Sequence, residues 1–316
     1  MRERPHPVAS HTGLMGATGP TRPLARRTAV AVLGAAALGA CTRTSTGPAR
    51  PSVAASASGG TAPVPPPSST APAPPEALPD VRRWRPSPAD VSPACKVAAV
   101  RELERRGNGP GTALEVVAAQ YGGILTDSAS VLVVCRTWRR RAGEVVPGGR
   151  TFDVRLTRGR RGWRVTGVRP SRPGPRADRL TTAARRVLEE QRIRLPPAAR
   201  ADVQSGRVHD SVLTTMLALS RRYRIGVSVV RSGHPTLVFG TDRRSDHPQG
   251  MAFDTWSIDG HPVIDPGTPE RLVVGYLRAL ADLGSDNVGG PYLVGAAPQF
   301  FSDATHRDHV HAGFAS

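Results

Sequence analysis

Residues 245–254 of this 316-residue chain read SDHPQGMAFD and predict a tight turn that runs directly into a β-strand. Gly250 lets the backbone turn after His247, because glycine adopts conformations that other residues avoid. In a strand, Ala252 and Asp254 would face the same side. The segment therefore brings an imidazole and a carboxylate together, beside a small side chain that leaves room for a third group.

A second polar segment lies close to the C-terminus, where residues 306–311 read HRDHVH. In a strand, His309 and His311 would share a face, so that one can bind a metal ion while the other donates to a polarised carbonyl. Together the two segments offer two imidazoles and a carboxylate that can converge on one ion. Nitrogen and oxygen ligands of this kind, with a fourth position left to water, are typical of a catalytic zinc centre.

The two segments resemble the zinc D-Ala-D-Ala carboxypeptidases and their relatives in the lysostaphin, D-Ala-D-Ala peptidase and hedgehog superfamily. The resemblance covers about residues 205–314. Either half of the motif would be weak by itself, but both halves in the right order are fairly specific. The family pattern Ser-x-His-x-x-Gly-x-Ala-x-Asp, with a later His-x-His, is matched by Ser245, His247, Gly250, Ala252, Asp254, His309 and His311.

The resemblance implies a Zn2+ ion held by His247, Asp254 and His311. It also places Asp308 where many relatives have a catalytic glutamate. Arg231 resembles the arginine that holds a substrate carboxylate in this family.

The identity of the general base stays open between three residues. Asp308 is shorter than glutamate, and in a regular strand it would point away from His309 and His311. His309, or secondarily His306, is therefore also considered for this role. Ser245 is assigned to the substrate-binding residues. It is expected to support His247 or the turn rather than to act as a nucleophile.

The activity implied by the resemblance is hydrolysis of peptidoglycan stem peptides by a D,D- or L,D-type carboxypeptidase or endopeptidase. One alternative is a non-catalytic wall lipoprotein that holds a metal ion or a peptide end in the same pocket. Another is a metal-dependent phosphodiesterase, against which an exported location argues. His234 and His261 are expected to be surface or hydrogen-bonded loop histidines rather than ligands.

The elements around these segments predict an α+β fold for residues 173–316. Helices are expected over 179–192, from Asp210 and after Thr268, and a strand over 225–231. They would enclose a small, mostly antiparallel sheet, as in the hedgehog and D-Ala-D-Ala-peptidase-like domain that the resemblance implies.

Residues 83–172 predict a second, smaller and basic α+β domain. A helix over 94–104 is followed by strands over 130–135, 152–156 and 163–168, with Gly and Arg turns between them. This order is loosely similar to nuclear-transport-factor-like or cystatin-like folds. It contains no catalytic constellation.

The positive charge of the chain is concentrated in one region. Of the net charge of +18, residues 80–200 contribute most, with 26 basic and 11 acidic side chains, whereas residues 201–316 contain 10 basic and 12 acidic ones. Lys96 is the only lysine, a bias typical of a GC-rich genome. The basic region can attract anionic wall polymers, or it can be a solvated arginine surface with no dedicated partner. Nucleic acid is not expected as a partner.

Residues 1–41 predict an export signal. An Arg-Arg pair precedes an uncharged run over 28–40, which is too short to span a bilayer as a helix but suits the core of a signal peptide. The run ends in LGAC at Cys41 and resembles the lipobox of bacterial lipoproteins. The resemblance implies a lipid anchor on Cys41 and a location outside the cytoplasm, facing the wall. An ordinary signal peptide is the alternative, and the general and twin-arginine export routes both stay open.

Residues 42–82 are rich in Pro, Ala and Ser and predict a disordered, extended linker. In polyproline conformation it would reach on the order of 100 Å. Such a linker would carry the folded part away from the membrane and into the wall.

Two cysteines, Cys95 and Cys135, remain if Cys41 is acylated. Outside the cytoplasm such a pair can form a disulfide, which is the favoured interpretation. Two free buried thiols are the alternative.

Overall fold

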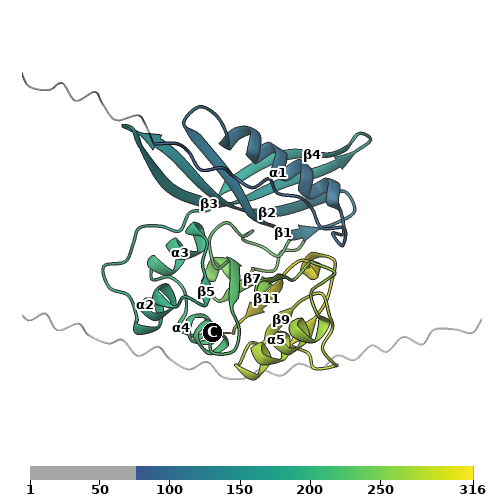
Figure 1. Cartoon of the computed structure of the whole chain (residues 1–316). Coiled ribbons are helices and arrows are strands. Elements are labelled where there is room, and N and C mark those ends of the chain that lie inside the picture. The colour runs from purple at the N-terminus through teal and green to yellow at the C-terminus, as the bar shows by residue number, and fades with distance from the viewer. Residues whose placement is uncertain (1–75, 316) are drawn as a thin grey trace, which may run out of the picture. The chain divides into compact units, whose positions relative to one another are not determined.

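The computed structural model describes residues 76–315, so that Cys41, the export signal and most of the predicted linker lie outside the described residues. The described residues belong to one compact unit, Ser69–Ser316. Their fold is mixed α+β, as predicted (Figure 1). Between residues 76 and 315, no helix has the length and apolar character needed to cross a membrane.

The N-terminal part is a helix followed by an antiparallel meander. Its elements are α1 (Pro93–Gly107), β1 (Thr112–Ile124), β2 (Ser128–Arg141), β3 (Glu144–Gly159) and β4 (Gly162–Pro170). The four strands pair in chain order. The predicted helix and the three predicted strands are confirmed, whereas β1 was missed because Ala and Gly are poor strand formers.

Cys95 and Cys135 are both fully buried and both free, so the favoured disulfide is not formed and the alternative of two buried thiols describes the structure. The two residues belong to the same hydrophobic cluster between α1 and the sheet. Burial raises the pKa of the Cys95 thiol to about 12. A thiol with so high a pKa is almost entirely protonated at neutral pH and is therefore unreactive.

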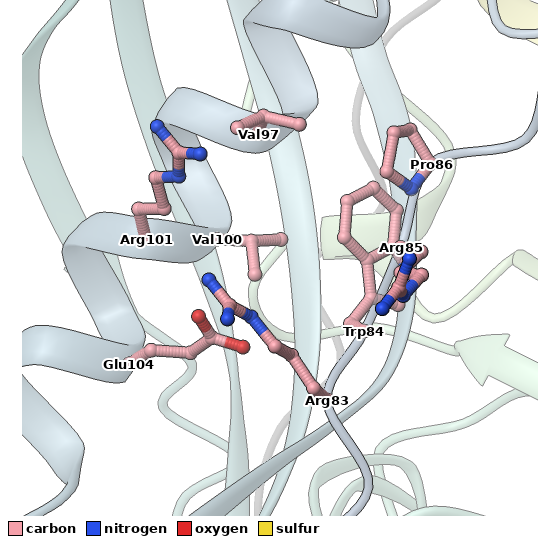
Figure 2. A pocket seen from close by; sticks show the side chains of 8 residues that line it. All are labelled: Arg83, Trp84, Arg85, Pro86, Val97, Val100, Arg101 and Glu104. Atoms are coloured by element: carbon pink, nitrogen blue, oxygen red, sulfur yellow. The ribbon is translucent and has the colours of Figure 1, made fainter.

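The residues before α1 are extended and run beside the helix. Figure 2 shows Trp84 and its neighbours facing α1 across a shallow groove whose other wall includes Val97 and Val100. Trp84 packs against the cluster under α1. The groove is also lined by Arg83, Arg85 and Arg101, which belong to the basic region noted in the sequence.

The C-terminal part contains a seven-stranded mixed sheet with the strand order β10-β9-β11-β7-β6-β5, and β8 pairs with β7. The β5–β6 and β9–β10 pairs are parallel and the other pairs are antiparallel. The elements are α2 (Thr182–Glu189), β5 (Ile193–Arg194), α3 (Pro197–Gln204), α4 (Asp210–Ser220), β6 (Ile225–Val229), β7 (Ala252–Ile258), β8 (His261–Pro262), α5 (Glu270–Asp282), β9 (Asn287–Gly289), β10 (Phe300–Phe301) and β11 (Val310–Gly313).

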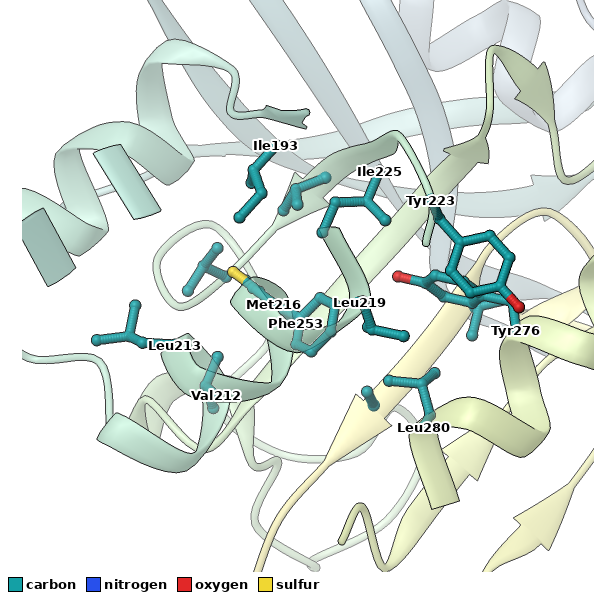
Figure 3. Close-up of a cluster of buried hydrophobic side chains, with 14 of the residues drawn as sticks. Ile193, Val212, Leu213, Met216, Leu219, Tyr223, Ile225, Phe253, Tyr276 and Leu280 are labelled. Atoms are coloured by element: carbon teal, nitrogen blue, oxygen red, sulfur yellow. The ribbon is translucent and has the colours of Figure 1, made fainter. Parts of the chain in front are cut away.

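The main apolar core of this part combines side chains of helices α4 and α5 with side chains of the sheet, such as Ile225 and Phe253 (Figure 3). Leu213 and Met216 of α4, predicted with Leu217 to form its buried face, are fully buried, whereas Leu217 is half-buried. The sequence predicts Asp210 and Thr268 as the N-caps of these helices, whereas the structure has the N-caps one residue away, at His209 and Pro269. This core holds the central strands β7 and β11 in place, and these strands carry the polar residues described next.

Candidate metal centre

Strand register brings Asp254 and His311 together. The two residues lie directly opposite each other on β7 and β11. Residues opposite each other on neighbouring antiparallel strands point to the same face of the sheet. Asp254 Oδ1 lies 3.1 Å from His311 Nδ1. Both side chains are buried.

His247 reaches the same point from the turn before β7. It starts a short 3-10 turn, His247–Gln249, which ends at Gly250. Gly250 has φ +78°, and a Cβ there would lie 2.1 Å from the Arg207 carbonyl oxygen, so only glycine fits. His247 Nε2 lies 3.1 Å from Asp254 Oδ1 and 3.2 Å from His311 Nδ1.

The three facing atoms fit one tetrahedral cation. A tetrahedral zinc ion, with bonds of about 2.0–2.1 Å, holds its ligand atoms about 3.3 Å apart. The spacings between His247, Asp254 and His311 are 3.1–3.2 Å. His247 Nδ1 donates to the Val230 carbonyl at 2.8 Å, which leaves the lone pair of Nε2 free for an ion. The structure therefore brings together the three side chains that were predicted as ligands.

His234 is a further member of this cluster. His234, His247 and Asp254 form a group that can hold a metal ion, with ligand atoms all within 4.8 Å of one another. The His234 ring stacks on the His247 ring at 4.2 Å between centroids, and its Nδ1 lies 3.1 Å from Ser245 Oγ. His234 was expected to be a loop histidine rather than a ligand, whereas the structure places it among the residues that can hold the ion. Ser245 contacts His234 rather than His247.

Two members of the cluster, Asp254 and His311, are in protonation states that suit a cation. Burial disfavours the charge of Asp254, yet the imidazoles of His247 and His309 hold the pKa of this carboxyl well below its usual value. Burial lowers the pKa of His311 to about 4. The carboxylate is therefore ionised and His311 is neutral near pH 7, which are the states that metal ligands require. Burial opposes the charge of His247, but the Asp254 carboxylate outweighs burial and raises the pKa of this imidazole, so ion binding there would release a proton.

Asp308 does not face the cluster. Its Oδ1 accepts from His309 Nδ1 at 2.6 Å. Its Oδ2 accepts from the Tyr121 backbone N–H at 3.0 Å and from Lys96 Nζ at 2.7 Å. Asp308 is also buried. Both oxygens are occupied, so Asp308, which matches the position of the family's catalytic glutamate, is poorly placed to act as the general base.

His309 is the residue that faces the cluster. Its Nδ1 is bound to Asp308, and its Nε2 lies 3.8 Å from Asp254 Oδ1. His306 lies further out, where its ring is 5.0 Å from that of His309 and its Nδ1 bonds to Asp303 Oδ1 at 2.8 Å. Of the three sequence candidates for the base, His309 has the best position.

Arg231 points away from the cluster, which corrects its assignment to substrate binding. Its Nη2 donates to the Pro173 carbonyl and lies 3.8 Å from Asp202 Oδ1. Asp202, on α3, is fully buried and also accepts from the Arg231 backbone N–H. The arginine that lines the open side of the site is instead Arg243.

An open cleft of about 310 Å³ lies beside the cluster. One wall is formed by residues 121–125, the end of β1 and the residue after it, and another is the loop that contains Phe239 and Arg243. The remaining wall carries side chains from the C-terminal segment, including Phe301, His306, His309 and His311. The buried cluster is therefore accessible from one side.

Sequence reasoning missed three contributors to this site, which all come from the N-terminal part. Gln120 Nε2 donates to Asp254 Oδ2 at 2.6 Å, and Lys96 and the backbone of Tyr121 bind Asp308. One signal was present for Lys96. It lies on the buried face of α1 at helical spacing from Ala99, Val100 and Leu103, where a charge is costly unless it is paired.

Three comparisons with known proteins gave no match to this chain: no family model, no curated protein and no solved structure is similar enough to be reported.

Proposed function

We propose that this protein is a zinc-dependent peptidase that hydrolyses the stem peptides of peptidoglycan at the cell envelope. The observation that carries the proposal is the set of three ligand atoms, on His247, Asp254 and His311, spaced 3.1–3.2 Å apart beside an open cleft. The motif resemblance adds the substrate class, and the predicted export signal adds the compartment.

Zinc is the metal proposed because two imidazoles, one carboxylate and an open fourth position form the donor set of catalytic zinc sites. A zinc ion bound there would supply a Lewis acid that lowers the pKa of water and polarises the scissile carbonyl. Manganese and magnesium favour oxygen-rich, six-coordinate sites, which the two imidazoles do not provide.

His309 is proposed as the general base and acid. Asp308 Oδ1 accepts the proton on Nδ1 of His309, so the Nε2 atom that faces the cluster is free to take a proton from the attacking water. The same Nε2 atom then gives this proton to the leaving amine. Asp308 thereby holds the tautomer and the ring orientation of His309 without touching the substrate.

The cleft suits a short peptide with a terminal carboxylate. Arg243 supplies a guanidinium on its wall, which can pair with a carboxylate and so favours carboxypeptidase action. Strand β1 lies at the edge of its sheet, where backbone groups can pair with an extended peptide. Gly122 and Gly123 place no side chain on that wall.

We expect zinc-loaded protein to shorten pentapeptide or tetrapeptide muropeptides by their terminal residue. The products are read by mass spectrometry, with chelator-treated protein and chelated protein reloaded with zinc as controls. Activity that disappears with the chelator and returns with zinc supports the proposal. If metal-replete protein leaves every muropeptide and whole sacculi intact, the peptidase proposal fails. The alternative of a non-catalytic binding protein would then be favoured.

A further inference from the structure

Lys96 stands apart from every other basic residue of the chain. It is the only lysine among 43 Lys and Arg residues, and its exposed fraction is 1%. Its Nζ contacts Asp308 Oδ2 at 2.7 Å and also bonds Asp90. The ammonium group further lies 4.6 Å from the centroid of the Tyr121 ring. A buried ammonium group is tolerated only where it is paired, and here both partners are buried carboxylates.

The centre contains two carboxylates, those of Asp254 and Asp308. In each of them the N-terminal part binds Oδ2, which is called the outer oxygen here. Gln120 holds Oδ2 of Asp254, which leaves Oδ1 to face His247 and His311. Lys96 and the Tyr121 backbone hold Oδ2 of Asp308 in the same way, which leaves Oδ1 for His309.

From this pattern we infer that the α1–β1 region completes the active centre, with Lys96 as a positioning residue for the Asp308–His309 pair. Gln120 has the corresponding role for Asp254. The expected effect on catalysis rests on the proposed function. The positioning of Asp308 and His309 follows from the contacts alone. Lys96 neither lines the cleft nor contacts the three ligand atoms, so its effect on the centre passes through its neighbours Asp308 and Tyr121.

A lysine suits this position better than an arginine. The ammonium group is a compact charge with three donors, which can serve two carboxylates in different directions. A planar guanidinium needs more volume and directs its donors in one plane. In a chain that otherwise uses arginine throughout, this requirement explains why the one lysine lies here.

The test uses full-length protein with the double substitution Lys96→Met and Asp90→Asn. The second change removes the acid that would otherwise be left unpaired in the core. We expect zinc stoichiometry and KM to stay near those of the wild type and kcat to fall about 10- to 100-fold, the range for residues that orient a metal site from outside. Asp90→Asn alone is the matched control and should keep kcat within a few-fold of the wild type.

A second readout does not need activity. The downfield proton resonance of His309 Nδ1–H, assigned by its loss in His309→Gln, should be present in wild type and in Asp90→Asn. It should shift or disappear in the double variant. An unchanged resonance and an unchanged kcat in the folded double variant would overturn the role of Lys96. If the wild type cleaves no muropeptide, the proposed function fails, while this resonance still decides the positioning role.

The variant Gln120→Met tests whether the N-terminal part completes the centre, even if the double variant does not fold. The substitution keeps the volume and removes the donor to Asp254. We expect the zinc Kd, measured by competition with a chelator, to rise about 10- to 100-fold. A zinc Kd equal to that of the wild type would overturn the inference that the N-terminal part completes the centre.

Discussion

His247→Ala should abolish stoichiometric zinc binding and reduce peptide hydrolysis by at least about a thousandfold. The substitution removes one of the three proposed ligands and leaves Asp254 Oδ1 and His311 Nδ1, one ligand fewer than catalytic zinc sites have. Without the ion, the pKa of the water that attacks the peptide bond stays at its bulk value, far above the value of about 7 that zinc-bound water has. Metal content after dialysis and kcat/KM on muropeptides measure the two effects.

His261→Ala is the matched control for this prediction. His261 is an exposed histidine on β8. Its removal should change neither zinc content nor activity. Full zinc content and normal hydrolysis in His247→Ala would contradict the assigned ligand set. Loss of zinc in both variants would instead indicate a general effect of removing histidines.

His309→Gln should lower kcat by about 100- to 10,000-fold while zinc stays bound, because general acid–base catalysis contributes in this range. The ligand atoms on His247, Asp254 and His311 do not include any atom of His309. The variant therefore separates proton transfer from metal binding. Steady-state kinetics together with zinc content distinguish the two.

The variant His306→Gln is the control that distinguishes the proposed base, His309, from another histidine of the same cleft. His306 lines the same cleft, but its Nδ1 is bound to Asp303, and its ring lies 5.7 Å from that of His311. We expect a loss of less than about tenfold, within the range of a residue that only shapes the cleft. A larger loss in His306→Gln than in His309→Gln would move the base role to His306.

The local parts of the site could be predicted from sequence because they depend on local geometry. Gly250 indicated a turn that only glycine permits, and Asp254 followed it at strand spacing. Helices α1, α4 and α5 followed from apolar periodicity and nearby capping residues. That His311 joins Asp254 was expected only through the family resemblance, and the strand register that sets the two residues opposite each other was not predicted, since two segments so far apart contain no local signal of their pairing.

The errors arose where a distant partner decides the role of a side chain. Arg231 follows a strand, as a substrate arginine would, but Asp202 on α3 binds it. Asp308 precedes the last ligand, as a catalytic acid would, but Lys96 binds its outer oxygen. The charge of Lys96 on an apolar helix face could have signalled a buried ion pair, though not which carboxylate completes it.

The most direct measurement is anomalous X-ray diffraction from crystals of the zinc-loaded protein, collected on both sides of the zinc absorption edge. The account predicts one strong peak within about 2.3 Å of His247 Nε2, Asp254 Oδ1 and His311 Nδ1, with a non-protein ligand in the fourth position. A crystal soaked in zinc that shows no peak there, or a peak coordinated by His234 in place of His311, would contradict it.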